Sequence, residues 1–190
     1  MNRIDTSEIS EFKIYLNNNL SGFSLDDLEK LLNLMEITRF HKQSQVPNEF
    51  VKRNLCIIKN GTVRHYIDTE RLEDQTLRFT FSGELLHYYG DEGEQLQAIS
   101  DCSVYYISIN SLTTILDSPI KIKESIDKST LNKLSFEVYL LRISPEERYK
   151  LILRKEREIF LNAQAKYIAS YLGITPQALS RIRKRLLSGH

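Results

Sequence analysis

The segment that most restricts the fold of this chain is a short turn near its end, Gly173-Ile-Thr-Pro176, between two apolar-striped stretches. Glycine tolerates the left-handed backbone conformation that ends many helices. Threonine followed by proline favours a helix start, because the hydroxyl accepts a hydrogen bond from a free backbone N–H and proline has no N–H to satisfy. Apolar residues at helical spacing flank the turn on both sides: Ile168, Ala169, Leu172, Ala178, Leu179, Ile182 and Leu186. The sequence therefore predicts two short helices over residues 165–187, with Ile174 filling the angle between them.

The second predicted helix carries polar and basic side chains on the face opposite its apolar stripe, and residues 159–190 contain no Asp or Glu. Gln and Arg can form paired hydrogen bonds with adenine and guanine, whereas Ser and further Arg side chains suit phosphates. A DNA-binding helix-turn-helix inserts the N-terminal half of such a helix into the major groove. We therefore expect nine residues to contact DNA: Lys166, Thr175, Pro176, Gln177, Ser180, Arg181, Arg183, Lys184 and Arg185.

An ordinary helical hairpin with a solvated basic face is the alternative interpretation of this segment. The turn chemistry, the small residue Ala169 and the absence of acidic residues favour nucleic-acid binding. The distribution of charge agrees, because residues 1–145 contain 16 Lys and Arg against 21 Asp and Glu, whereas residues 146–190 contain 10 against 4. Only the last quarter of the chain is electrostatically suited to meet phosphates.

Residues 38–108 show the period-two pattern of β-strands. The segments 55–58 and 62–67 flank Asn60-Gly61, a dipeptide that favours the type I′ turn, so we expect them to form a hairpin. Strands are also expected over 77–81 and 102–107, and an amphipathic helix over 25–35 after a cap at Ser24. About 70 residues of short strands predict a small antiparallel jelly roll or barrel.

Helical spacing returns after Asn110 and continues to Arg142, with an interruption at Pro119. We expect this long, apolar-striped helix to form a dimer seam; the alternative is a helix packed back on its own barrel. The run Ser144-Pro-Glu-Glu147 then starts another helix with a capping box. The expected domains are a β-barrel sensor domain with N-terminal helices (1–116), a dimerisation helix (117–142) and a helix-turn-helix DNA-binding domain (143–190).

The motif Ile168-Ala-Ser-Tyr-Leu-Gly-Ile-Thr-Pro-Gln-Ala-Leu-Ser-Arg-Ile-Arg-Lys184 resembles the helix-turn-helix of Crp/Fnr-type bacterial transcription regulators, most closely the short versions common in Bacteroidetes-like bacteria. Looser matches at Ser144–Tyr149, Ile57–Arg64 and Ser82–Glu84 extend the resemblance over nearly the whole chain. The resemblance implies an α+β fold: an N-terminal antiparallel jelly roll like a cyclic-nucleotide-binding domain, a long dimerisation helix and a C-terminal helix-turn-helix domain.

The function implied by the resemblance is that of a homodimeric, sequence-specific DNA-binding transcription regulator in the bacterial cytoplasm. Its implied partners are double-stranded DNA, RNA polymerase and a small-molecule effector. A reducing cytoplasm suits Cys56 and Cys102, which lie in apolar strand-like segments and are expected to be buried free thiols. We expect no membrane association, because no apolar run reaches spanning length and the N-terminus lacks a secretory signal.

The predicted sensor domain departs from the family members that bind cyclic nucleotides. Those members hold the phosphate with a cassette that begins with Gly-Glu and ends, some ten residues later, with Arg and a small hydroxyl residue. Gly83-Glu84 matches the start, but residues 90–98 contain no Arg or Lys and offer Asp91, Glu92 and Glu94 instead. Carboxylates repel a phosphodiester, so we expect no response to cyclic AMP or cyclic GMP. The effector, if the protein has one, is unassigned.

No cofactor or metal is predicted. An iron–sulfur cluster needs about four cysteine ligands, and the chain has two Cys. His41, His65 and His87 could be considered for haem, but an isolated His in a strand is more often hydrogen-bonded. An apolar effector pocket could be lined by aromatic residues that are otherwise expected in the core: Tyr66, Phe79, Phe81, Tyr88, Tyr89 and Tyr105.

An enzymatic function is not expected, because the sequence lacks a Gly-rich phosphate loop, a nucleophile elbow and a His-Glu metal motif. The alternative to a regulator is a small-molecule- or partner-binding module whose helical tail makes protein contacts. Since the sequence ends four residues after Leu186, we also expect no wing after the recognition helix, and greater reliance on Arg183, Lys184 and Arg185 for phosphate contacts.

Overall fold

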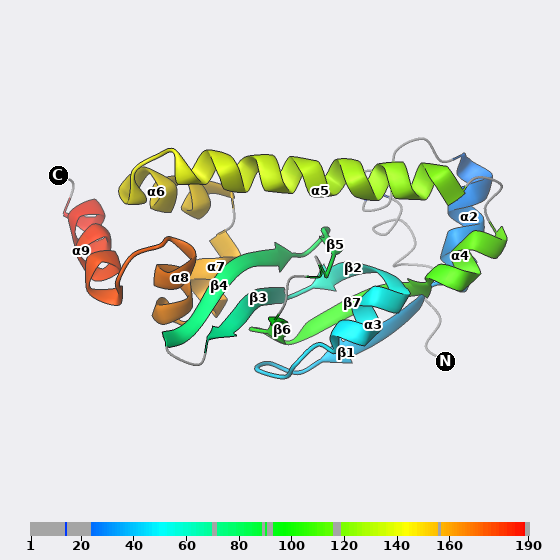
Figure 1. Ribbon diagram of the computed structural model, residues 1–190, viewed down its shortest axis with the longest axis horizontal. Helices are drawn as coiled ribbons and strands as arrows, with labels where there is room; N and C mark the ends of the chain where they lie inside the picture. The colour runs from blue at the N-terminus through cyan, green and yellow to red at the C-terminus, as the bar shows by residue number, and fades with distance from the viewer. Residues whose placement is uncertain are drawn as a thin grey trace.

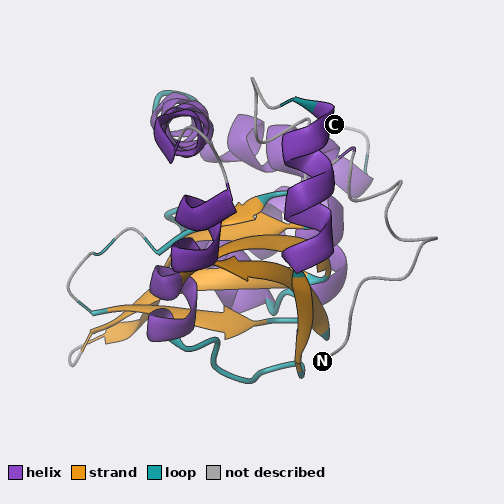
Figure 2. Ribbon diagram, turned by 90° about the vertical axis from the view of Figure 1, so that its right-hand side faces the viewer, coloured by secondary structure: helices purple, strands orange, loops and turns teal. Residues whose placement is uncertain are grey.

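The computed structural model of the chain describes residues 14, 24–69, 72–88, 90, 93–115, 119–155 and 157–188. Two small antiparallel sheets form the middle of the molecule, and the long helix α5 (Pro119–Leu141) runs above them (Figure 1). Helices α2 (Leu25–Leu34) and α4 (Ile109–Ile115) lie at one end, and the C-terminal helices lie at the other (Figure 1). Figure 2, which looks along α5, shows this helix above the strands.

The described strands are β1 (Glu36–Phe40), β2 (Asn54–Asn60), β3 (Thr62–Thr69), β4 (Leu72–Phe81), β5 (Leu85–Leu86), β6 (Glu94–Ala98) and β7 (Cys102–Ser108). The remaining helices are α3 (Asn48–Arg53), α6 (Pro145–Lys155), α7 (Arg157–Asn162), α8 (Ala165–Tyr171) and α9 (Pro176–Leu187). The strands form two sheets, with the orders β1-β7-β2-β5 and β4-β3-β6, and all neighbouring pairs are antiparallel. The predicted α+β fold, an antiparallel jelly roll followed by C-terminal helices, is confirmed.

The two sheets face each other across an apolar core, and we call this pair of sheets the β-roll. Ile58 and Val104 from one sheet meet Val63, Leu96 and Ala98 from the other, all fully buried. Because successive strand residues point to opposite faces, the alternate residues are left to face outward. Helices cover these outward faces, so each sheet carries buried residues on both sides.

Two further clusters cover the outward faces of the β-roll. Ile57 and Tyr105 pack beneath α2 and α4, together with Leu31 and Leu112. The other sheet presents its outward residues to the C-terminal helices through a second cluster: Phe79, Phe81, Ile99, Leu140, Tyr149, Ile152, Ile159, Ile168, Ala169, Leu172, Leu179 and Ile182. The helix-turn-helix and the β-roll therefore share one continuous core.

The predicted hairpin at Asn60-Gly61 is wrong. Strand β2 pairs with β7 and β5, whereas β3 pairs with β4 and β6, so the chain crosses from one sheet to the other at Gly61. Gly61 has a φ of +91°, which the dipeptide correctly anticipates, and a Cβ at this position would lie 2.5 Å from the Asp101 carbonyl oxygen. Local sequence specified the backbone of this corner, but the strand partners were set by distant segments.

The helix boundaries follow the predicted caps. Ser24 and Asp27 form a capping box at the start of α2, and Ser144 and Glu147 exchange equivalent hydrogen bonds before α6. Helix α5 begins at the expected interruption, Pro119. The six-residue α3 lies inside the region expected to be strands, so its presence corrects that expectation. The predicted domain limits stay a prediction.

Cys56 and Cys102 are buried free thiols, as expected. Burial raises the pKa of Cys56 to about 12 and also raises the pKa of Cys102, so both are protonated near neutral pH. Among the helices that the structure describes, none combines the length and the apolar character needed to cross a lipid bilayer.

Candidate nucleic-acid interface

The turn between α8 and α9 has the predicted chemistry. Gly173 adopts a φ of +67°, and its N–H donates to the Ser170 carbonyl at 2.9 Å. The Ile174 N–H donates to the Ala169 carbonyl at 3.0 Å, which closes the end of α8. Thr175 caps α9, since its hydroxyl accepts from the Ala178 N–H at 3.2 Å, and Pro176 occupies the first turn.

A half-buried arginine of α6 holds this turn in place. The Arg148 guanidinium, on α6, donates to the Leu172 carbonyl at 2.7 Å and to the Ile143 carbonyl at 3.4 Å. Tyr149 and Ile152 of the same helix join the apolar core beneath α8 and α9. The angle between the two helices is therefore held by packing and by hydrogen bonds to backbone groups that a helix end leaves free.

One face of α9 is exposed and polar, and we call its residues the reading face: Gln177, Ser180, Arg181 and Lys184. Their spacing of three and four residues places them in a single stripe, opposite buried Leu179 and Ile182. Lys166, Thr175 and Pro176 are also exposed, beside the turn. Within the described part of the chain, the Gln177, Arg181 and Lys184 side chains make no hydrogen bond or ion pair.

Two of the predicted contact residues differ from the others. Arg183 is half-buried. Arg185 is exposed, but its Nη2 lies 2.9 Å from the Glu146 carboxylate, whose other oxygen lies 2.9 Å from Lys150 Nζ. The hydrogen bond from Lys150 and the charge of Arg185 lower the pKa of Glu146. Arg185 is therefore engaged at the start of α6 in the structure.

Helix α5 carries a separate apolar stripe on its exposed side. Leu131, Leu134, Val138 and Leu141 are 37 to 73% exposed and follow a three–four–three spacing. This is the spacing of a and d positions in a coiled coil. The opposite side of the helix, with Leu140 and Ile126, packs on the rest of the chain.

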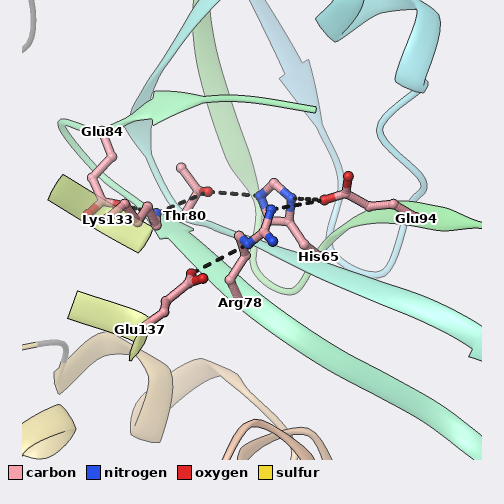
Figure 3. A network of polar contacts seen from close by, with 7 residues as sticks. All are labelled: His65, Arg78, Thr80, Glu84, Glu94, Lys133 and Glu137. Carbon is pink, nitrogen blue, oxygen red and sulfur yellow. Dashed lines mark hydrogen bonds and ion pairs between the residues drawn. The ribbon is translucent and has the colours of Figure 1, made fainter. Parts of the chain in front are cut away.

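Between α5 and the β-roll lies a group of charged and polar side chains, the interior polar network, which Figure 3 shows: His65, Arg78, Thr80, Glu84, Glu94, Lys133 and Glu137. His65, fully buried on β3, makes contacts of 2.9 Å with Glu94 and with Thr80. Arg78 lies 3.5 Å from the same Glu94 oxygen and 3.4 Å from Glu137 of α5. The network therefore ties three strands of one sheet to the long helix.

The second link to α5 is Lys133, which lies 2.7 Å from Glu84 and 3.5 Å from the Thr80 hydroxyl. Burial lowers the pKa of His65 to about 4, so its ring is neutral near pH 7. Burial also raises the pKa of Glu137, against the effect of nearby Arg78. A cavity of about 480 Å³ adjoins the network, lined by residues that include Glu84, Lys133 and Glu137.

The predicted aromatic effector pocket is not formed. Tyr66 packs on Arg64, Phe79 and Phe81 face the C-terminal helices, and Tyr105 lies beneath α2 and α4. Tyr88 lines a different cavity, of about 400 Å³, and Tyr89 lies outside the described residues. Phe79 and Phe81 share one face of β4, whereas Tyr105 belongs to the other sheet and Tyr88 follows β5, so these side chains fall into separate clusters.

Comparisons with known proteins support one family. No protein-family model matches the chain. The fumarate and nitrate reduction regulatory protein of Vibrio cholerae is 27% identical over 187 residues, which cover 86% of this chain and 74% of that protein. The chain is similar in sequence to this regulator, which agrees with the resemblance of its helix-turn-helix motif to Crp/Fnr-type regulators.

Solved structures share the fold. FixK2 from Bradyrhizobium japonicum superposes with a TM-score of 0.65 at 19% identity, covering 82% of this chain and 85% of that one. A regulator assigned to the Crp/Fnr family from Eubacterium rectale gives 0.63 at 17% identity, covering 93% and 89%. At these identities the likeness concerns the fold, and the α+β architecture of the Crp/Fnr family is thereby confirmed.

The Crp/Fnr cassette that sequence analysis singled out is occupied by the protein's own contacts. Glu84 accepts a hydrogen bond from the Phe81 N–H at 3.0 Å and pairs with Lys133. Glu94 is fully buried against His65 and Arg78, which corrects the expectation that its carboxylate lines an open phosphate site. Asp91 and Glu92 lie outside the described residues.

The three histidines considered for haem lie in different surroundings. His65 belongs to the interior polar network, His87 is half-buried with its pKa lowered to about 4, and His41 is exposed, 3.9 Å from Asp101. Within the described ranges, no three His, Cys, Asp or Glu side chains group so as to hold a metal ion. The residues that sequence analysis missed are Arg78, Lys133 and Glu137. Arg78 could have been noticed as a charge at an inward-facing strand position, but its partners lie far away in the sequence.

Proposed function

We propose that this regulator binds DNA sequence-specifically through α9, acts as a homodimer and does not respond to cyclic nucleotides. The reading face carries the proposal: a stripe of one amide, one hydroxyl and two cations projects from the start of a capped helix. Arg181 and Gln177 match the donor and acceptor patterns of guanine and adenine. Lys166, Thr175, Pro176, Ser180, Arg183, Lys184 and Arg185 complete the proposed interface as phosphate or backbone contacts.

Dimerisation is supported by the stripe on α5. Four large apolar side chains are exposed on one helix face, which is costly for a monomer and fits a parallel helix pair. A twofold axis along α5 presents two recognition helices to half-sites about 34 Å apart. Sedimentation of the protein should give the mass of a dimer. Leu134→Asp together with Val138→Asp should shift it to a monomer, because like charges then face each other across the axis.

The charge of the interior polar network supports the absence of a cyclic-nucleotide response. The network contains three carboxyl groups, of Glu84, Glu94 and Glu137, and two cations, Arg78 and Lys133. The His65 ring is neutral. A phosphodiester that enters this region meets an excess of negative charge, and both cations already have carboxylate partners. The effector class and any contact with RNA polymerase stay expectations from the family.

Selection from a pool of random duplex DNA, without added ligand, tests the proposal. We expect a palindromic consensus whose half-sites are one helical turn apart. Enrichment that depends on added cyclic AMP would contradict the effector part of the proposal. Failure of the folded dimer to enrich any sequence under either condition would favour the alternative, in which the helical tail contacts a protein.

A further inference from the structure

The helix-turn-helix contacts the β-roll directly, because its first helix, α8, lies against it. One face of α8 packs on the outward face of the sheet formed by β4, β3 and β6, and Figure 1 shows α8 alongside β4. Three α8 residues make the contact: Tyr167, Ser170 and Tyr171. None of them belongs to the predicted DNA-contacting set, so this surface is separate from the proposed interface with DNA.

At the centre of this contact, the guanidinium of Arg64 is clamped between two aromatic rings. Its central carbon lies 4.3 Å from the ring centre of Tyr66 on the same strand and 3.8 Å from that of Tyr167 on α8. The Arg64 side chain is fully buried. Cation–π contacts of this kind restrict the orientation of both partners, because the guanidinium lies close to two rings at once.

Oxygen atoms on β4 contact the nitrogens of the Arg64 guanidinium. Its Nε donates to the Thr76 hydroxyl at 2.8 Å, and its terminal nitrogens lie 3.4 Å from the Asp74 carboxylate and 3.3 Å from the Asp74 carbonyl oxygen. Burial lowers the pKa of Arg64, while Tyr167 and Asp74 oppose that effect. A buried charge with such partners tolerates few other arrangements.

A backbone contact reinforces the clamp. The pairing of β3 with β4 shifts between His65–Arg78 and Tyr66–Thr76, which leaves Leu77 as an extra residue. Next to this bulge, the Thr76 N–H donates to the Ser170 hydroxyl of α8 at 2.8 Å. The rings of Phe79 and Tyr171 meet edge to face at 5.2 Å further along the same helix. The bulge thus turns a strand N–H outward, toward the DNA-binding domain.

We propose that Arg64 is a positioning residue for DNA binding, which fixes the orientation of the helix-turn-helix on the β-roll and so sets the distance between the two recognition helices of the dimer. This inference rests on the proposed DNA-binding function. The arrangement in which α8 packs on the β-roll is suited to DNA binding, because the reading face of α9 stays exposed in it. Without the clamp, each helix-turn-helix samples several orientations, and the dimer tolerates several half-site separations.

The experiment compares operators whose half-sites, taken from the selected consensus, stand at the selected spacing or one to two base pairs nearer or farther apart. We expect the wild-type protein to lose about tenfold or more in affinity at the altered spacings, since coupled sites commonly differ by that factor. Arg64→Met and Tyr167→Leu should reduce this loss to about twofold, while the preferred half-site sequence is unchanged. Tyr167→Phe keeps the stacking ring and should restore the wild-type profile.

Arg39→Met is the matched control, because it removes an exposed arginine from β1 in the other sheet and should leave the spacing profile unchanged. If circular dichroism shows that Arg64→Met does not fold, the spacing profile of Tyr167→Leu, on the surface of α8, tests the proposal in its place. A folded variant that keeps the wild-type spacing preference overturns the role of Arg64. Wild-type protein that binds no DNA at all overturns the proposed function itself, an outcome that is distinct from the first.

Discussion

The reading face of α9 and the interior polar network place the same kinds of charged side chain in opposite surroundings. Arg181 and Lys184 are exposed on α9, whereas Arg78 and Glu94 are buried and lie 3.5 Å apart. An exposed cation keeps its hydration, so the fold loses little by holding it and it remains available to a phosphate. A buried charge is tolerated only while its partners stay in place. Charge therefore stays available for the proposed recognition of DNA in one region and fixes geometry in the other.

The largest effect should come from removing the carboxylate at the centre of the network. Glu94→Ala leaves the buried Arg78 without one of its two carboxylates and deprives His65 of a 2.9 Å contact. Breaking a buried ion pair from one side commonly costs about 3 to 5 kcal/mol. We expect the free energy of unfolding, measured in urea, to fall by this amount.

Glu29→Ala provides the comparison, because Glu29 is exposed on α2 and its loss should change the unfolding free energy by less than about 0.5 kcal/mol. If both substitutions have equally small effects, the network does not stabilise the fold in the way its burial indicates.

The second effect is a pH dependence of stability that originates in two histidines of the β-roll, His65 and His87. Burial lowers the pKa of His65 to about 4, and that of His87 to about 4, from the ordinary value near 6.5. Between these values the unfolded chain binds protons that the folded chain excludes, so stability is full above about pH 6.5 and decreases as the pH falls toward 4. We expect each histidine to contribute a loss of about 2 kcal/mol between pH 7 and pH 4.5, so that the two together account for about 4 kcal/mol, measured as urea midpoints.

His65→Gln should make this pH dependence shallower, whatever its effect on stability at pH 7, because one of the titrating groups is gone. The raised pKa of Glu137 acts against the histidines, since the folded state then holds a proton more tightly than the unfolded chain. An unchanged slope in the His65→Gln variant would show that the buried ring does not govern the acid response.

The two regions also differ in how far the sequence predicts them. The turn of the helix-turn-helix is determined within a few residues: Thr175 caps through Ala178, and Gly173 bonds to Ser170. Because all of these partners are local, sequence reasoning found the turn, both helices and the exposed stripe. The Asn60-Gly61 corner shows the limit of the same reasoning, since the backbone conformation was local but the choice of strand partners was not.

The buried charged side chains of the β-roll contact partners that no local sequence pattern identifies. His65 and Arg78 stand directly opposite each other in the ladder between β3 and β4, but Glu137 approaches Arg78 from a helix that follows both sheets. Arg64 likewise meets Tyr167 only once the C-terminal domain has packed on the sheet. An inward-facing charge signals that a partner exists, whereas the identity of the partner depends on the tertiary fold.

The third effect concerns DNA binding and not stability. Arg181→Ala removes an exposed guanidinium from the reading face, so it should weaken binding to the selected operator by about 1 to 3 kcal/mol and relax the base preference at one position. The unfolding free energy should stay within about 0.5 kcal/mol of the wild type. Fluorescence anisotropy with labelled duplexes measures the first quantity, and Arg39→Ala on β1 serves as the matched control. Equal binding by both variants would remove Arg181 from the interface.

The smallest effect should come from the ion pair between α6 and α9 in the C-terminal helices. Glu146 holds Arg185 at 2.9 Å and Lys150 at 2.9 Å, and both contacts are at the surface. Because exposed ion pairs contribute little to stability, Glu146→Gln should leave the unfolding free energy nearly unchanged. It should release Arg185 toward phosphate, strengthening binding at low salt by about two- to threefold and steepening the dependence of log K on log salt by about one unit. Glu124→Gln, on exposed α5, removes the same charge elsewhere. A salt dependence that is equal in the two variants would show that Arg185 makes no phosphate contact and serves only to join α9 to α6.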